Sequence, residues 1–246
     1  MGIIGLGGGG SHVVQQSAHA GIKNYVLYEF DRLEESNLNR TVIGSLADAK
    51  QNKPKLELAI ELIRGLHPDA NIVPIGTRWQ DTPLPLRECD IIIGCIDGFD
   101  ERRQLEATAR RYLMPYIDIG LDVNLVEPEP PKMSGQVILS MPGGPCLTCL
   151  GFLNDNNLAK EATDYGAAGI RPQVVWANGV IASTAVGLVI DLMTGWTKTS
   201  PRAVYLQYDG NNGTMIPHKR LEYLDLNAGC PHHPMNAVGD PIFTKL

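Results

Sequence analysis

The sequence lacks an excess of positive charge, a leader segment and an even number of cysteines. Each of these absences argues against a class of protein. It has no excess of positive charge, since 21 Lys and Arg against 27 Asp and Glu give a net charge of −6; a general nucleic-acid binder is therefore not expected. No charged-then-apolar leader opens the chain, so we expect no secretion signal. The five cysteines are odd in number, which favours metal binding or burial over a disulfide framework and predicts a cytoplasmic protein.

Long uncharged runs are also scarce, with one exception at residues 173–190. An apolar helix of that length is either a membrane span or a central buried helix. The run contains Gln173, Asn178, Ser183 and Thr184, and no basic cluster flanks it. These polar residues favour a buried helix, and we expect no membrane association.

The 246 residues contain no internal repeat and can form one large α/β domain. Strand signals at 3–4, 24–29, 71–75, 90–95 and 116–119 alternate with helical signals at 11–20, 54–66 and 101–113. This alternation predicts a doubly wound, mostly parallel, Rossmann-like sheet.

The second half of the chain has a different pattern. We expect a strand at 136–140, a short helix within 146–153, a polar loop at 154–172, and strands at 204–208 and 214–218. The turn residues between the last two strands are typical of a hairpin. Antiparallel strands should therefore complete the sheet.

A glycine-rich loop, residues 5–11, lies between the first strand and the first helix. Glycines let the backbone approach a phosphate closely, and the helix N-terminus offers it free N–H groups. Glu29 ends the second strand, roughly twenty residues later, where a carboxylate can accept hydrogen bonds from ribose hydroxyls. These features fit ATP as well as NAD.

Two cysteine-containing motifs lie far apart in the chain. Cys146 and Cys149 form a CxxC pair, and Cys230 with His233 has CxxH spacing. Together they can supply four ligands to a closed, structural, tetrahedral zinc site. The choice of His233 over His232 depends on spacing alone. The alternative is a redox pair or core cysteines with a solvated histidine tail, whereas Cys89 and Cys95 are expected in the core.

A further set of motifs occurs in a fixed order along the chain. It comprises the glycine loop, EFD at 29–31, SNLNR at 36–40, KPK at 53–55, CID at 95–97, GGPCLTCL at 143–150 and NAGC at 227–230. In this order and spacing the sequence resembles the MoeB/ThiF family, whose fold is shared by the adenylating half of ubiquitin-activating enzymes. The resemblance covers nearly the whole chain, and SNLNR is its most diagnostic part.

The resemblance implies a function and a division of the chain. Family members bind ATP and Mg²⁺ and adenylate the C-terminal carboxylate of a ubiquitin-like or sulfur-carrier protein ending in Gly-Gly, and they are often homodimers. Residues 1–246 would then be one adenylation domain. Residues 1–130 would form its nucleotide-binding half, and 131–246 its carrier-binding and zinc-binding half.

The resemblance also implies residue roles. Arg40, Lys55 and Asp97 would act in catalysis, where cationic groups offset charge on the triphosphate. Asp97 would hold Mg²⁺, Arg40 and Lys55 would contact the triphosphate, and Glu29 would hold the ribose in place of the family's usual Asp. The full set of expected nucleotide-site residues is Gly7, Gly8, Gly10, Glu29, Asp31, Asn37, Arg40, Lys55 and Asp97.

Other interpretations of the sequence remain open. One is an NAD(P)-dependent oxidoreductase, and another is a non-catalytic relative that binds a ubiquitin-like protein. Lys55 can be a solvated charge, Arg40 can pair with a nearby glutamate, and Asp97 can cap the following helix. Some relatives carry a cysteine in the polar loop, and its absence here favours adenylation alone. Relatives often carry an arginine before the first strand; none occurs here, which leaves open a truncated chain, an arginine supplied by another subunit or a weak enzyme.

Overall fold

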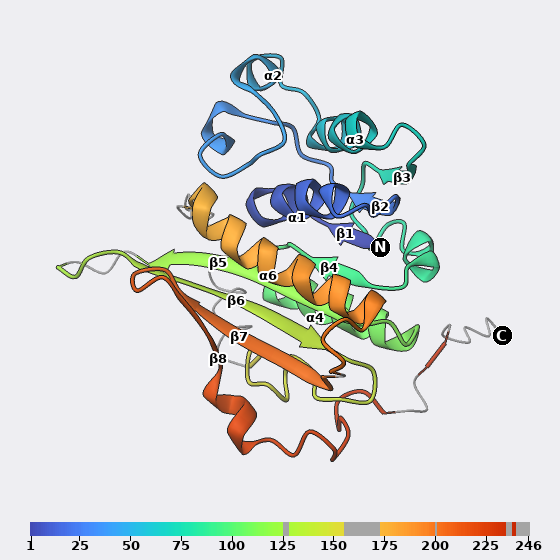
Figure 1. Cartoon of the computed structure of the whole chain (residues 1–246), viewed down its shortest axis with the longest axis vertical. Helices are drawn as coiled ribbons and strands as arrows, with labels where there is room; N and C mark the ends of the chain where they lie inside the picture. Colours follow the sequence, from blue (N-terminus) through green and yellow to red (C-terminus); the bar gives the residue numbers. More distant parts are fainter. Residues whose placement is uncertain (125–127, 155–172, 200, 235–237, 240–246) are drawn as a thin grey trace.

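The computed structural model describes residues 1–124, 128–154, 173–199, 201–234 and 238–239. Its centre is one eight-stranded sheet with the order β3-β2-β1-β4-β5-β6-β7-β8 (Figure 1). The first five strands of that order are parallel and the last three are antiparallel, which confirms the predicted sheet. The strands are β1 Gly2–Ile4, β2 Asn24–Tyr28, β3 Asn71–Ile75, β4 Ile92–Gly94, β5 Tyr116–Asn124, β6 Lys132–Ser140, β7 Ala203–Asp209 and β8 Thr214–Pro217.

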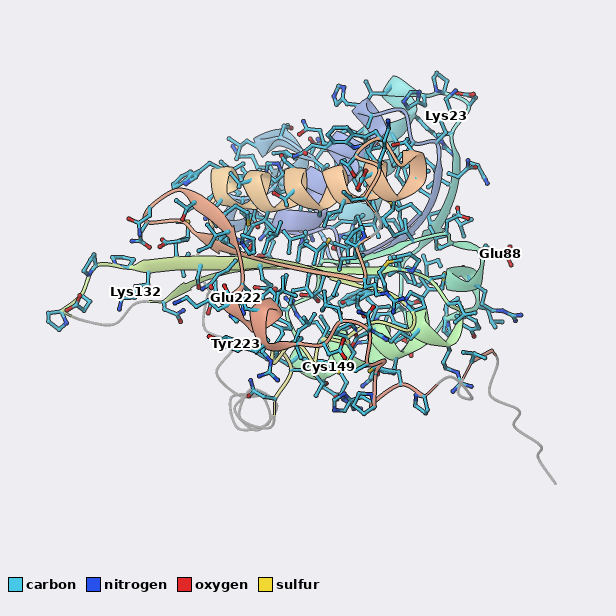
Figure 2. All side chains as sticks on the ribbon, turned by 60° about the horizontal axis from the view of Figure 1, so that its bottom comes forward. Lys23, Glu88, Lys132, Cys149, Glu222 and Tyr223 are labelled. Atoms are coloured by element: carbon cyan, nitrogen blue, oxygen red, sulfur yellow. The ribbon has the colours of Figure 1, made fainter. Side chains whose placement is uncertain are left out.

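Helices cover both faces of the sheet because the central strands are apolar on both sides. Neighbouring residues such as Ile3 and Ile4 point into different hydrophobic cores. One core lies under α1 Gly8–His19, α3 Lys55–Leu66 and α6 Val175–Thr194, and the other lies under α4 Phe99–Arg111. Figure 2 shows the sheet from its edge, with α6 on one side and Cys149 on the other. The short helices are α2 Leu46–Lys50, η1 Glu35–Asn37, η2 Leu84–Glu88 and η3 Lys219–Tyr223.

Helix α6 covers one face of the sheet and is buried along one side, whereas the sequence predicted a buried helix. Ala177, Ile181 and Ala185 are buried, and the helix packs against α1, β5 and β6. Its other face leaves Trp176 and Val180 exposed. Within the described parts of the chain, this is the one helix whose length and composition would suit a membrane span, and 44% of its most apolar window is buried.

Two local predictions were wrong. The segment 146–153 forms turns, not a helix, because Gly151 adopts a left-handed φ of +75° that interrupts the first helical turn. The strand expected at 90–95 is confined to Ile92–Gly94, whereas β5 and β6 are longer than predicted. Most of the expected polar loop, residues 155–172, lies outside the described residues.

Helix α4 buries charged side chains, although its sequence looks like that of a solvated helix. Arg102, Glu106 and Arg110 recur every four residues and therefore share one helix face. Their exposed fractions are 5%, 1% and 5%. This charged face lies against the sheet and the turns that follow β6, and it accounts for contacts described below.

Candidate functional site

The carboxyl ends of β1, β2 and β4 converge at one edge of the sheet. The strand order reverses there, because the chain leaves β1 for β2 on one side and later returns to β4 on the other. In open α/β sheets, ligands bind in the crevice at such a switch point. The glycine loop follows β1, Glu29 follows β2 and Asp97 follows β4, and all three strands end at this edge.

The glycine loop is compact because its glycines approach other backbone atoms. Gly5 has a φ of +86°, and its N–H donates to Tyr28 O at 2.9 Å. A Cβ on Gly10 would lie 1.9 Å from Gly5 O. The first turn of α1 thus begins directly above the end of β1, which leaves its N-terminal N–H groups facing the crevice.

A pair of alanine substitutions should test this packing. Gly10→Ala should lower the free energy of unfolding by about 3 kcal/mol, because its Cβ would collide with backbone that cannot rotate away. Gly65→Ala is the matched control, since Gly65 lies within α3 and has open space around its Cβ position. Chemical denaturation measures both, and equal losses would contradict the proposed close approach.

Glu29 is 7% exposed and binds backbone. Its Oε2 accepts a hydrogen bond from Leu6 N at 2.7 Å, and Oε1 accepts from Phe30 N and Asp31 N, both at 2.9 Å. The carboxylate therefore joins the glycine loop to the end of β2.

Lys55 is a buried cation at the crevice, not a solvated one. The residue is 7% exposed and begins α3, and its Nζ lies 3.2 Å from Asp31 Oδ2. Asp31 is 57% exposed at its side chain, so one carboxylate at the surface holds an otherwise enclosed ammonium group.

The SNLNR segment folds around η1. Asn37 is 7% exposed, and its Oδ1 accepts from Glu34 N at 3.4 Å. Arg40 donates from Nη1 to Ser36 O at 2.9 Å and to Asn39 Oδ1 at 3.1 Å. No carboxylate of the described residues pairs with Arg40, so the alternative of a surface ion pair with a nearby glutamate is not supported.

Asp97 is exposed three residues after the end of β4. The N-cap of α4 is Gly98, and no side chain caps that helix. Asp97 therefore does not serve as the helix cap that the sequence left open. Its exposed carboxylate follows the carboxyl end of β4 and offers oxygen ligands of the kind that suit Mg²⁺.

The sequence did not predict that the start of α6 would lie beside the glycine loop. A Cβ on Gly8 would be 2.6 Å from Asn178 Nδ2 and 2.6 Å from Gln173 Oε1. Asn39 Nδ2 also donates to Gln173 O at 3.1 Å. Residues 173–178 consequently connect the glycine loop with the SNLNR segment, and only the three-dimensional fold reveals it.

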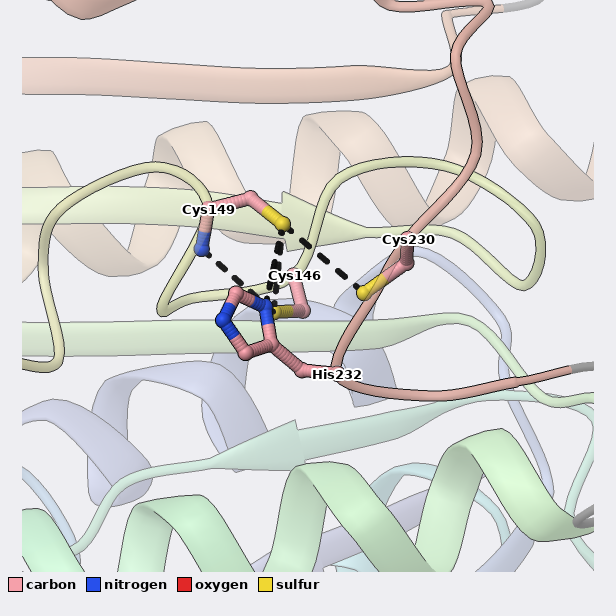
Figure 3. A group of neighbouring side chains, drawn as sticks. All are labelled: Cys146, Cys149, Cys230 and His232. Atoms are coloured by element: carbon pink, nitrogen blue, oxygen red, sulfur yellow. Dashed lines mark hydrogen bonds between the residues drawn. The ribbon is translucent and has the colours of Figure 1, made fainter.

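The cysteines form a compact group on the other face of the sheet (Figure 3). Cys149 Sγ lies 3.6 Å from Cys146 Sγ and 3.8 Å from Cys230 Sγ. His232 Nδ1 lies 3.4 Å from Cys146 Sγ and 3.3 Å from Cys149 Sγ. Ligands of a tetrahedral zinc ion would be about 3.8 Å apart for sulfur pairs and about 3.5 Å apart for sulfur and nitrogen. The four side chains therefore fit zinc.

The histidine in this group is His232, which corrects the choice of His233 made from spacing. Nδ1 is the ring nitrogen nearer to the backbone, so a histidine two residues after Cys230 can turn back onto the sulfurs. His233 is absent from that four-residue group and forms a second one with Glu106 and Cys146, in which its Nε2 lies 3.8 Å from Glu106 Oε2. Pro231, directly after Cys230, has a fixed φ and thereby restricts the path of the chain between these ligands.

Two buried residues of α4 support the CxxC turn. Glu106 Oε1 accepts from Leu147 N at 2.9 Å, directly after Cys146. Arg110 donates to Gly144 O at 3.0 Å and to Pro145 O at 2.7 Å. The charged face of α4 therefore orders the segment that carries two of the four ligands, and outer contacts of this kind orient metal ligands.

A second buried polar cluster lies where β5 crosses α4. Asp118 is fully buried and accepts hydrogen bonds from Arg102 Nη1, from Tyr116 Oη at 2.9 Å and from Gln136 Nε2 at 3.3 Å. Burial raises the pKa of Asp118 against the opposing effect of Arg102. An acid between Ile117 and Ile119 in an apolar strand was the available sequence signal, and it was missed.

Comparison with known proteins agrees with this geometry. Residues 1–231 match the ThiF family model. Molybdopterin-synthase adenylyltransferase of Escherichia coli is 30% identical over 232 residues, which cover 93% of this chain and 84% of the relative. SAMP-activating enzyme E1 of Haloferax volcanii is 28% identical over 192 residues, covering 77% of this chain and 66% of that enzyme.

The fold has a solved counterpart. The structure of E. coli MccB with ATP superposes with a TM-score of 0.68 at 19% sequence identity, and the match covers 88% of this chain and 62% of the MccB chain. The chain thus spans less than two thirds of that protein. From the family match over 231 residues and the shared arrangement of strands, the chain belongs to the ThiF family.

Proposed function

We propose that this protein uses ATP to adenylate the C-terminal glycine carboxylate of a ubiquitin-like or sulfur-carrier protein. The observation that supports this most is that the glycine loop, Glu29 and Asp97 follow strands that end at one edge of the sheet, with the buried Lys55 paired to Asp31 just beyond β2. A triphosphate needs cationic side chains and a metal ligand together, whereas a dinucleotide needs neither. The names of the molybdopterin-synthase and SAMP-activating relatives point to the same chemistry.

In the proposed reaction a carboxylate oxygen of the carrier attacks the α-phosphorus of ATP. The bond from that phosphorus to the bridging oxygen breaks, and pyrophosphate leaves with the electron pair. Arg40 and Lys55 would stabilise the triphosphate charge, and Gly7, Gly8 and Gly10 would line the phosphates. Mg²⁺ would supply additional charge neutralisation on the leaving group, held by Asp97.

Other residues would bind the nucleoside and orient the triphosphate. Glu29 would accept from the ribose while keeping the loop in place, because its backbone contacts already fix its direction. Asp31 would position Lys55, and Asn37 would contact the triphosphate. Positioning of this kind is the main contribution that a protein makes to phosphoryl-transfer chemistry.

We further propose the division of labour inferred from the sequence. Residues 1–130 contain the strands and loops around the nucleotide crevice, and 131–246 contain the cysteine group and the antiparallel strands that would receive the carrier and its Gly-Gly tail. Zinc bound by Cys146, Cys149, Cys230 and His232 would be structural, since four protein ligands leave no open position.

A homodimer in the cytoplasm is the assembly we propose. The outer face of α6 exposes Trp176 and Val180, and no charged residue occurs within 173–190. A partner subunit would cover such a face more favourably than water does. Light scattering of the purified protein tests the assembly, and a monomer at micromolar concentration would contradict it.

Pyrophosphate exchange tests the proposed reaction. The protein is incubated with ATP, Mg²⁺, labelled pyrophosphate and candidate carriers that end in Gly-Gly. We expect label to enter ATP only when a cognate carrier is present, because the reverse reaction requires the acyl-adenylate. ATP binding without exchange would favour a non-catalytic relative, and NAD(P)H binding without ATP binding would favour an oxidoreductase.

A further inference from the structure

Two arginines of helix α4 are buried to the same extent but differ in how many of their N–H donors are hydrogen-bonded. Arg102 and Arg110 are each 5% exposed and lie on the same helix face. Arg110 uses all of its nitrogens: Nε and Nη2 donate to Ser140 Oγ, and Nη1 and Nη2 donate to the carbonyls of Gly144 and Pro145. It is a satisfied structural cation.

Arg102 has one hydrogen-bond acceptor in the described structure. Its Nη1 donates to Asp118 Oδ1. Its Nε is buried without a partner, and its Nη2 takes part in no hydrogen bond among the residues that the structure describes. The ring of Phe152 lies 5.5 Å from Arg102 Cζ, but stacking on the guanidinium face uses none of its N–H donors.

The two unused nitrogens form one edge of the guanidinium group. Nε–H and an Nη2–H are parallel, and this side-on fork matches the two oxygens of a carboxylate or a phosphoryl group. Asp118 occupies Nη1 and fixes the side chain, so the free edge has a defined direction. Buried donors of a native protein are nearly always paired, which makes the unpaired Nε an indication of a ligand.

Arg102 lies near the carboxyl end of β4, on the side of the sheet edge where Asp97 is found. Asp118 is the register partner of Gly94, the last residue of β4, and Asp97 follows three residues later. Burial opposes the charge of Arg102, but Asp118, Tyr116 and Asp97 outweigh it and raise the pKa of Arg102. A Cβ on Gly120 would lie 2.8 Å from Nη2, so a side chain there would displace the guanidinium.

We propose that the Nε–Nη2 edge of Arg102 binds an anionic oxygen pair of the reactants, either the C-terminal carboxylate of the carrier or the α-phosphoryl group to which it becomes joined. This inference rests on the proposed function and adds a residue to it. Arg102 would hold the attacking group beside Asp97 and supply positive charge at the reacting centre from within this chain.

The test compares Arg102→Gln and Arg102→Lys with Arg103→Gln in the full-length protein. Arg103 is the matched control, because it is the neighbouring arginine but pairs with Asp100 at the surface. Calorimetry measures binding of AMP and of a Gly-Gly-terminated peptide with either a free carboxylate or a carboxamide. Thermal unfolding and zinc content verify the fold, and Arg102→Lys preserves the buried charge beside Asp118.

We expect Arg102→Gln to weaken one probe roughly 10- to 100-fold and Arg102→Lys to weaken it less, while Arg103→Gln leaves binding unchanged. Weaker binding of the free-carboxylate peptide alone identifies the carrier tail as the ligand, and weaker AMP binding identifies the phosphoryl group. Unchanged binding by folded Arg102 variants, or no binding of either probe by the wild-type protein, overturns the inference. Arg102-dependent binding without pyrophosphate exchange would refute the proposed function but not this inference.

Discussion

Asp97→Asn should reduce carrier-dependent pyrophosphate exchange by roughly 10²- to 10³-fold or more. The substitution keeps the size of the side chain and removes the negative charge that would hold Mg²⁺ against the leaving pyrophosphate. Asp97 is exposed and does not cap α4, so the fold should not depend on it. The expected result is therefore a large loss of exchange with an unchanged unfolding temperature.

The matched control for Asp97→Asn is Asp100→Asn. Asp100 lies three residues further along, in the first turn of α4, and pairs with Arg103. Its substitution should cost little stability and leave exchange within about twofold of the wild-type rate. If the two variants lost exchange equally, Asp97 would have no special role, and the magnesium ligand would have to be sought elsewhere on the crevice edge.

Cys146→Ser should remove zinc and lower the free energy of unfolding by roughly 4 kcal/mol or more, because the loss of a structural metal is among the most destabilising changes known. Cys146 is fully buried, and burial is the main cause that raises the pKa of its thiol. A thiolate at this position therefore needs a cation. Metal analysis and chemical denaturation of the same sample measure the two effects.

Cys89→Ser provides the comparison for Cys146→Ser. Cys89 is also buried, 6% exposed, but lies outside the cysteine group. It should lose about 1 to 2 kcal/mol through burial of a hydroxyl and retain full zinc stoichiometry. Full zinc in Cys146→Ser would refute the metal site, whereas zinc loss without loss of stability would show that the metal is peripheral to folding.

The sequence was sufficient for the sheet because its signals are local. Short apolar runs such as Ile91–Ile93 indicate strands buried on both faces, and the glycines after Ile4 indicate a close turn into a helix. The same holds for the CxxC motif, whose two sulfurs are close in the chain. The strands, the glycine turn and the CxxC pair were therefore predictable, because each depends on residues that are close together in the sequence.

The missed features depend on contacts between distant segments. Nothing local in Arg102 or Glu106 shows that α4 turns its charged face inward, because the partners Asp118 and Ser140 lie on strands that follow it. The choice between His232 and His233 depended on how the backbone turns after Pro231. Residue roles at the crevice came from family resemblance, and they stay predictions until variants are measured.

The cysteine group also has a consequence for how the chain assembles. Its two halves are 81 residues apart at Cys149 and Cys230, and α6, β7 and β8 all lie between them. With metal bound, this stretch becomes a closed loop, and by analogy with a disulfide its closure removes about 4.5 kcal/mol of chain entropy from the unfolded state. If the metal ion binds early in folding, it therefore lowers the entropic cost of pairing β7 and β8 with the rest of the sheet.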